Sequence, residues 1–565
     1  MSERTDAAAP AGEDATGTGG GLLRRAGGWP YRVFLTLALG FGIVGVTRVW
    51  WAALGMWKDE AGIANNLRRD YLALTGHLKY DQVAPVGWLW LEKTLVEVIG
   101  PGDRVLRLPA FVGALAVLCL GTLVARRAIG RLGAVAVAGL LAVSPVLLVY
   151  AGELKQYTWE AGIALALILL GAWAYEALRW RGLAPVLRRP WPVVAWVAAT
   201  GVAVFVSYSA ILVVAGVTAA LMCLHALRRS WADAGWLAAL TAPAGATAAF
   251  LVYRRHQFSF YPGQTDYFRG GTAPAGAGPG EFLSWLPFMW SRFVIAPMSW
   301  GWPWLVLLLA VIGVVAMWRR NRLWAAMLLM VFLAALGGAA VRGYPMVSRP
   351  AIYLIAPTVL LVVAGVEGLL RATATLLRQA RATPRLRVPA VAAAVAMLAV
   401  LVGAAAMVRP VAGTVRKEVA QPLGKEALRD ALANVAPQLR PGDKLLVYYF
   451  GNAVTTWYAP LLGIENEIYH VRLCQPNSPD TKETGLYEKL AGAERVFYVQ
   501  GRLNATTRRD NFQVSLQALD AMGTIQEQHD APRDRIGPHS WALVDIDQVP
   551  PVPRPGPDDP CLELY

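Results

Sequence analysis

Long stretches of apolar residues recur between residues 33 and 408, and they decide what this chain can fold into. Each stretch approaches the ~20 residues that an α-helix needs to cross the hydrocarbon core of a bilayer. Hydrophobic residues make up 56% of the 565 positions and charged residues only 16%, whereas about 25% charge is usual in soluble domains. The chain is therefore predicted to be an all-α polytopic membrane bundle that ends in a soluble domain.

We predict about eleven transmembrane helices, one for each apolar stretch. Their expected bounds are 33–55, 105–125, 132–150, 157–177, 191–206, 209–227, 235–252, 302–318, 323–341, 351–370 and 388–408. The intervening loops alternate between arginine-rich and arginine-poor, and cytoplasmic loops carry the excess of Lys and Arg. This alternation predicts a multi-pass protein of the cell membrane, with a cytoplasmic N-terminus and an extracytoplasmic C-terminal region. The arginine-rich loops are 126–131, 179–189, 228–229, 319–322 and 371–387.

Three regions follow from this pattern. Residues 1–32 are small, polar and rich in Gly and Ala, which favours a disordered cytoplasmic N-terminus. Residues 33–409 form the bundle, with long outer loops at 56–104 and 253–301 that we expect to cover a cavity. The Gly/Pro/Ala centre of the second loop is expected to be mobile. Residues 410–565 alternate helical and strand patterns, which predicts an extracytoplasmic α/β domain with a parallel or mixed sheet.

The charge distribution argues against nucleic-acid binding. The whole chain carries a net charge of +15, but residues 410–565 contain 16 basic and 20 acidic residues, so the soluble part is acidic. A nucleic-acid-binding domain would need a basic face. Cys474 and Cys561 lie in this region and could pair in an oxidising compartment. No metal-ligand spacing such as HExxH occurs.

Several short polar segments fall on the predicted outer side. The first is Trp57-Lys58-Asp59-Glu60, directly after the first span. Its two adjacent carboxylates could act as a general base, bind a divalent cation such as Mg, Mn or Ca, or simply face water. The other segments supply Asp81 (YDQVAPVGW), Arg107 (LRLP), Glu153, Lys155 and Tyr157 (GELKQY), and Tyr344 and Arg349 (YPMVSRP).

In their order and their placement on one side of the membrane, these segments resemble the GT-C glycosyltransferases. The nearest branch contains the protein O-mannosyltransferases and the lipid A aminoarabinose transferase, and the resemblance covers residues 30–370. It implies transfer of a sugar from a polyprenyl-phosphate donor to an extracytoplasmic glycan, glycolipid or protein. It also implies that Asp59 is the catalytic base or orients the acceptor, with Glu60 as the second candidate. Asp81 departs from the commoner His- or Lys-containing form of its segment.

The phosphate of such a donor argues separately for cations at the outer surface. Lys155 and Arg349 occupy short outer turns, and we predict that they approach each other and bind the phosphate. Ordinary snorkelling of both side chains to the interface is the alternative. Glu153 is expected beside Lys155. Asp81, Arg107, Tyr157 and Tyr344 complete the predicted donor- and substrate-binding set.

A hydroxyl acceptor needs a base, and a carboxylate within hydrogen-bond reach can serve. Since we expect Asp59 in a hydrated loop, its replacement should remove activity and leave folding intact. A lipid or glycan transporter (flippase) is the main alternative function, and an assembly protein whose C-terminal domain recruits partners is a third. Transporters usually show internal repeats and mid-span charges, whereas the polar residues here gather at one surface. Which sugar and which acceptor are used stays open.

Overall fold

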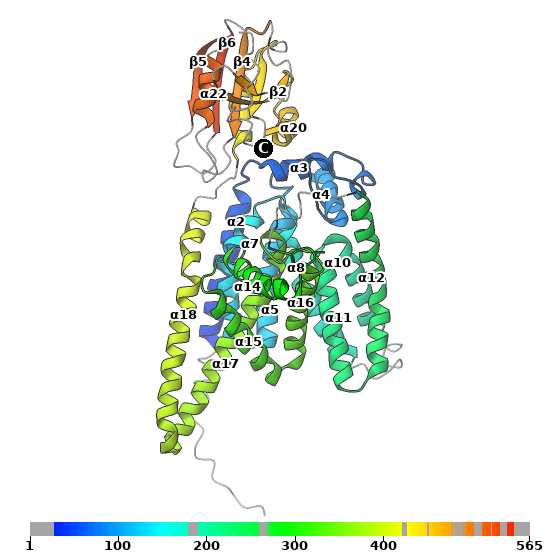
Figure 1. Cartoon of the computed structure of the whole chain (residues 1–565), viewed down its shortest axis with the longest axis vertical. Coiled ribbons are helices and arrows are strands. Elements are labelled where there is room, and N and C mark those ends of the chain that lie inside the picture. Colours follow the sequence, from blue (N-terminus) through cyan, green and yellow to red (C-terminus); the bar gives the residue numbers. More distant parts are fainter. Residues whose placement is uncertain are drawn as a thin grey trace, which may run out of the picture.

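A membrane-sized helical bundle carries a smaller sheet domain at one of its ends (Figure 1). The computed structural model describes residues 28–178, 190–258, 268, 270–420, 426–448, 451–475, 478–480, 490, 492–501, 511–520, 523–530 and 539–546. The helices up to residue 420 are α2 (Gly28–Trp51), α3 (Lys58–Leu67), α4 (Val86–Ile99), α5 (Leu108–Ala128), α6 (Arg131–Ala142), α7 (Pro145–Ala151), α8 (Tyr157–Leu178), α10 (Trp191–Val206), α11 (Ser209–Leu227), α12 (Trp231–Phe258), α14 (Pro279–Ile295), α15 (Pro303–Arg320), α16 (Arg322–Ala340), α17 (Ile355–Ala382) and α18 (Arg387–Ala420).

Within the described ranges, nine helices are long and apolar enough to cross a membrane. The pair α6 and α7, bent by 57°, adds a tenth crossing if it counts as one span. Pro145 explains the bend, because proline cannot continue a helix and restricts the residue before it. The remaining predicted span, 191–206, is α10, an apolar helix of only 16 residues. The polytopic bundle is confirmed, with nine or ten full crossings where eleven were predicted.

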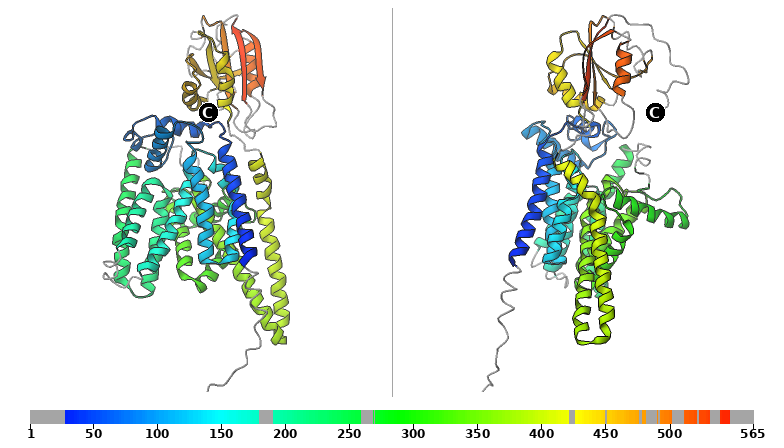
Figure 2. Two further views of the ribbon diagram at one scale, coloured as in Figure 1. Left: turned by 180° about the vertical axis from the view of Figure 1, so that it is seen from behind. Right: turned by 90° about the vertical axis from the view of Figure 1, so that its left-hand side faces the viewer.

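The last two bundle helices are longer than predicted. The arginine-rich segment 371–387 was expected to be a loop, but α17 continues through it almost to Pro384. Its Ala, Leu and Arg residues are strong helix formers, and proline then ends the helix. Figures 1 and 2 show the resulting α17–α18 hairpin projecting beyond the ends of the other helices.

Two glycines let α15 and α17 touch through their backbones. A Cβ atom at Gly313 would lie 2.0 Å from the carbonyl oxygen of Leu361, and one at Gly365 would lie 2.1 Å from that of Leu309. Small residues commonly permit such close helix contacts in membranes. The crossing fixes α17, and with it the 3-10 helix η2 (Arg349–Leu354) that directly precedes α17.

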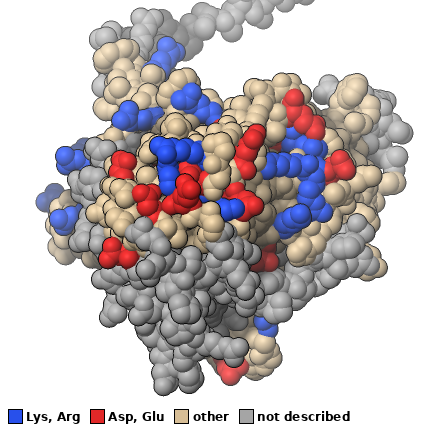
Figure 3. All heavy atoms as spheres, turned by 90° about the horizontal axis from the view of Figure 1, so that it is seen from above, with Lys and Arg blue, Asp and Glu red and all other residues tan. Residues whose placement is uncertain are grey.

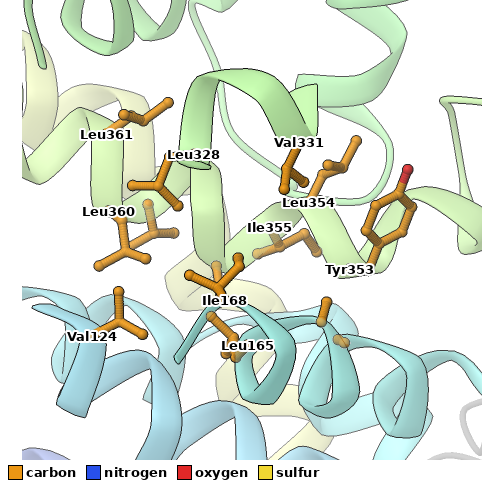
Figure 4. Close-up of a cluster of buried hydrophobic side chains, with 14 of the residues drawn as sticks. Val124, Leu165, Ile168, Leu328, Val331, Tyr353, Leu354, Ile355, Leu360 and Leu361 are labelled. Carbon is orange, nitrogen blue, oxygen red and sulfur yellow. The ribbon is translucent and has the colours of Figure 1, made fainter. Parts of the chain in front are cut away.

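Apolar side chains from α5, α8, α16, η2 and α17 form one buried cluster. Val124, Ile168, Leu328, Leu354 and Leu360 are among its members (Figure 4). Close packing of this kind leaves little freedom for the elements that contribute to it. The cluster therefore holds the start of α8 and the start of η2 in fixed relative positions, and these two places carry polar residues of interest.

The C-terminal region is an α/β domain with a mixed six-stranded sheet in the order β3-β2-β1-β4-β6-β5. The central strand β1 pairs in parallel with β2 and β4, while β6 pairs antiparallel with β4 and β5. Helices α19 and α20 cover one face of the sheet and α22 the other. Strands β2 and β5 were not predicted from the sequence. The elements are α19 (Leu428–Val435), β1 (Lys444–Tyr448), α20 (Asn452–Leu461), β2 (Ile468–Gln475), β3 (Ser478–Asp480), β4 (Arg495–Gly501), α22 (Asn511–Asp520), β5 (Gly523–Asp530) and β6 (His539–Ile546).

The short helices α3 and α4 lie between the bundle and the sheet domain (Figure 1). Their apolar residues share one buried core with α19, α20 and the sheet, represented by Ile63, Trp88, Leu432 and Trp457. A continuous core of this kind joins the two parts through the segment that follows the first span. Cys561 and the side chain of Cys474 lie outside the described residues, so their pairing stays a prediction.

Candidate active site

The acidic pair after the first span opens a helix. Asp59 and Glu60 occupy the first turn of α3, whose N-cap is Trp57. Carboxylates are favoured there because the free N–H groups and the helix dipole give a helix N-terminus partial positive charge. The prediction that Asp59 lies in a hydrated loop is therefore wrong, because Asp59 lies in a helix. The side chain of Asp59 is 25% exposed and that of Glu60 only 2%.

Two cations from distant segments meet at Asp59. Arg349 Nη1 lies 3.2 Å from Asp59 Oδ2, and Lys155 Nζ donates to the backbone carbonyl of Asp59 at 3.2 Å. Both cations also face the ring of Trp57, with Arg349 Cζ at 5.6 Å and Lys155 Nζ at 5.8 Å from its centroid. The structure thus brings together α3, the turn between α7 and α8, and η2.

Lys155 is almost buried, with 4% of its surface exposed. Its Nζ also donates to Gln82 Oε1 at 3.1 Å. Burial lowers the pKa of Lys155 from 10.5 to about 8, although the charge of Asp59 acts in the opposite direction. The lysine is therefore charged at neutral pH and close to titration. Gln82 was absent from the predicted site, since an amide in a loop gives no distinctive sequence signal.

The backbone on both sides of this cluster is strained. Ser348, directly before Arg349, has φ 55° and ψ −148°. Tyr80 and Asp81, directly before Gln82, have φ values of 61° and 54°. Non-glycine residues adopt such conformations at a cost of about 1–3 kcal/mol each and do so mainly at functional sites. Asp81 itself is exposed, whereas the next residue, Gln82, contacts Lys155.

Glu60 faces away from Asp59 and into the protein. It lies 3.1 Å (Oε1) and 3.2 Å (Oε2) from the guanidinium of Arg107, which is 2% exposed and also donates to the carbonyl of Leu54. Glu60 further accepts the backbone N–H of Leu154. A buried, two-point ion pair is structural in character. Glu60 as a second base and Arg107 as a donor ligand therefore fit this geometry poorly.

The remaining predicted residues surround the cluster. Glu153 is 6% exposed, and its charge opposes the lowering of the pKa of Lys155. Tyr157 begins α8, with its ring edge-on to that of Tyr150 at 5.3 Å. Tyr344 lies with its hydroxyl 3.3 Å from Glu160 Oε2. Burial raises the pKa of Tyr344 well above its ordinary value, so this hydroxyl remains a donor.

Glu160 was not predicted from the sequence. Its carboxylate is 2% exposed and accepts the backbone N–H of Tyr208 at 3.0 Å, at the start of α11. The Tyr208 hydroxyl in turn donates to the carbonyl of Ala84 at 2.8 Å, in the segment that carries Gln82. Glu160 thus links Tyr344 to the other side of the cluster. Only its helical register, three residues after Tyr157, could have suggested this.

A joint cation site for the acidic pair does not fit the geometry. Asp59 and Glu60 pair with different arginines. Among the residues that the structure describes, no three His, Cys, Asp or Glu side chains come together as metal ligands. The face that carries the sheet domain shows basic and acidic side chains next to one another (Figure 3). Local pairs therefore shape the electrostatics more than any broad basic patch.

The chain matches no protein-family model and no curated protein. It is similar to the solved structure of ArnT from Cupriavidus metallidurans in the apo state, with 17% identity and a TM-score of 0.42 over 92% of this chain and 98% of that chain. The same protein bound to undecaprenyl phosphate is 16% identical, with a TM-score of 0.43 over 93% of this chain and 99% of that chain. The Archaeoglobus fulgidus oligosaccharyltransferase tethered with an acceptor peptide is 12% identical, with a TM-score of 0.44 over 83% of this chain and 69% of that chain. All three TM-scores lie below 0.5.

Proposed function

We propose that this chain is a membrane glycosyltransferase of the GT-C type. It takes a sugar from a polyprenyl-phosphate donor and transfers it to a hydroxyl group of an extracytoplasmic glycan, glycolipid or protein. One observation carries the proposal: a partly exposed carboxylate, Asp59, lies beside two cations at one end of the bundle, Lys155 in the turn before α8 and Arg349 as the first residue of the span Arg349–Ala382. A base and a phosphate site side by side are what such a transfer requires.

The chemistry divides between these groups. Asp59 accepts the proton of the acceptor hydroxyl while the oxygen of that hydroxyl forms the new bond to the anomeric carbon of the sugar. The bond between that carbon and the phosphate oxygen breaks, and the phosphate leaves with the electron pair. Lys155 and Arg349 stabilise the charge that develops on the phosphate. Arginine suits this task because its planar fork can bind two phosphate oxygens at once.

The Asp59–Arg349 ion pair gives this scheme an order of events. With 25% and 12% of their side chains exposed, the two groups are accessible to an incoming phosphate. The phosphate competes with Asp59 for Arg349, and a carboxylate released from its ion pair is a better proton acceptor. Donor binding therefore activates the base, and the base stays masked while the donor site is empty.

The proposed orientation follows the arginine distribution, with the N-terminus in the cytoplasm and the α/β domain outside the cell membrane. The donor's isoprenoid chain then stays in the bilayer while its phosphate meets the site at the outer surface. The position of the cluster supports an enzyme over a transporter. A transported substrate would need polar groups at mid-membrane, whereas Asp59, Lys155 and Arg349 come from one end of the bundle.

Binding of undecaprenyl phosphate to the purified protein in lipid nanodiscs tests the phosphate site. We expect Arg349→Gln and Lys155→Met to weaken binding at least tenfold. Arg349→Lys should weaken it less, because lysine keeps the positive charge, but should not match wild type, because lysine lacks the guanidinium fork. Asp59→Asn should bind at least as well as wild type, since it removes the carboxylate that competes with phosphate for Arg349. Equal affinity of wild type and Arg349→Gln would exclude the proposed site.

Turnover is measured in the same nanodiscs with a panel of undecaprenyl-phosphate pentoses and hexoses, by release of undecaprenyl phosphate in the presence of membrane extract as acceptor source. The proposal expects release with at least one sugar. Movement of the intact lipid between leaflets without release would favour the transporter alternative.

A further inference from the structure

The α/β domain holds α3 at both ends. At the N-terminal end, Tyr458 of α20 accepts the backbone N–H of Met56 at 3.0 Å. At the C-terminal end, Asn65 donates to the carbonyl of Ala453 at 2.7 Å, and Arg68 donates to the carbonyls of Thr456 and Trp457. The bundle contacts the same helix through the ion pairs of Asp59 and Glu60. Helix α3 is therefore clamped between two domains.

Glu426 makes the contact nearest to Asp59. Its Oε2 accepts the backbone N–H of Lys58, the first residue of α3, at 3.1 Å. The N–H groups of a first turn have no partner within their own helix, and Glu426 supplies one from a domain 368 residues away along the chain. The side chain is 2% exposed. It is confined by Gly501 at the end of β4, where an added Cβ would lie 3.0 Å from Glu426 Cγ.

We propose that the α/β domain is part of the active site of this protein, and that Glu426 is a positioning residue that fixes the first turn of α3 and so aims Asp59 at Arg349 and Lys155. This inference rests on the proposed function and extends it. Catalytic groups lose much of their effect when displaced by about 1 Å. Within this first turn, the bundle holds Glu60 through Arg107, and the α/β domain holds the Lys58 N–H through Glu426.

The protonation of Glu426 is consistent with this role. Burial raises the pKa of its carboxyl to about 8, although the hydrogen bond from the Lys58 N–H and the charge of Lys58 lower it; the charge of Asp59 adds a smaller increase. At neutral pH the group is therefore mostly uncharged. A neutral carboxyl can accept the Lys58 N–H without placing a second negative charge beside Asp59, so it does not compete with Asp59 for Arg349. Glutamine imitates this neutral form closely.

Three variants of the full chain in nanodiscs test the inference. Glu426→Leu keeps the volume and removes the acceptor, Glu426→Gln keeps an acceptor oxygen, and Glu467→Leu is the control, because Glu467 is 62% exposed in the same domain. We expect Glu426→Leu to lower turnover about ten- to hundredfold, since misplaced catalytic groups lose factors of this size, while affinity for undecaprenyl phosphate changes less than twofold. Glu426→Gln should restore most of the turnover, and the control should behave like wild type.

Hydrogen exchange separates this inference from the proposed activity, because it needs no donor sugar. In Glu426→Leu the amides of the first turn of α3 should exchange at least tenfold faster, whereas those at Asn65 should not change. If these amides exchange faster and no protein shows turnover, the positioning is supported and the proposed function fails. Unchanged exchange in Glu426→Leu, or full turnover despite faster exchange, overturns the inference. If Glu426→Leu does not fold, Glu426→Met replaces it, with the same outcomes expected at Lys58.

Discussion

Asp59 and Glu60 are neighbours in the sequence, and each pairs with an arginine from another part of the chain, yet the two pairs differ in kind. Asp59 and Arg349 share one contact of 3.2 Å and keep 25% and 12% of their side chains exposed. Glu60 and Arg107 share two contacts and are 2% exposed each. The first pair can open for a ligand, whereas the second holds α3 against the bundle. A step of one residue within the first turn of α3 thus separates the proposed base from a structural carboxylate.

Asp59→Asn should show the largest effect of any single change. Loss of a general base typically costs 10²–10⁴-fold in rate, so we expect turnover to fall by that factor. The free energy of unfolding should change by about 1 kcal/mol or less, because partly exposed ion pairs contribute little. Turnover and unfolding are measured on the same preparation. Turnover within tenfold of wild type would exclude Asp59 as the base.

Glu60→Gln should show the reverse pattern. Breaking a buried pair by removing one charge leaves Arg107 uncompensated, which typically costs 3–5 kcal/mol. We expect the free energy of unfolding to fall by about this amount, and turnover per folded molecule to fall less than in Asp59→Asn. Denaturant unfolding in detergent measures the first quantity. A stability loss no larger than that of Asp59→Asn would remove the contrast between the two pairs.

The smallest expected effect is a pH dependence of donor binding. The buried Lys155 has its pKa lowered to about 8, so its charge is present below this pH and is lost above it. Affinity for undecaprenyl phosphate should therefore weaken by up to about tenfold per pH unit above 8, well before an ordinary lysine titrates near 10.4. Titration calorimetry or fluorescence from pH 7 to 10 measures this.

Two variants check the assignment of this titration to Lys155. Lys155→Met should bind more weakly and lose the pH dependence. Glu426→Gln should keep it, although the pKa of Glu426 is also raised to about 8, because Glu426 does not contact the phosphate in our scheme. A pH dependence that persists in Lys155→Met would assign it to another group.

The sequence was sufficient to predict a polytopic helical bundle, because most of the spans are long apolar runs. It also indicated that Asp59, Lys155 and Arg349 would meet, since their segments share one side of the membrane. The resemblance placed Asp59 before Glu60 as the base, but the sequence could not predict that Glu60 is buried, because only the register of α3, a helix that was not predicted, turns one carboxylate outward and the other inward. Gln82, Glu160 and Glu426 were missed for a related reason. Each acts through contacts with residues far away in the chain, and none belongs to a distinctive local pattern.

The brevity of α10 has a consequence for the surrounding lipid. A helix of 16 residues is about 24 Å long at 1.5 Å per residue, about 6 Å less than the ~30 Å hydrocarbon thickness of a typical bilayer. Such a mismatch is relieved when the bilayer thins locally. Helix α10 packs against α4, which follows the segment that carries Gln82. We therefore expect the leaflet beside the site to thin around α10, so that thicker membranes oppose the fit of this protein and thinner ones favour it.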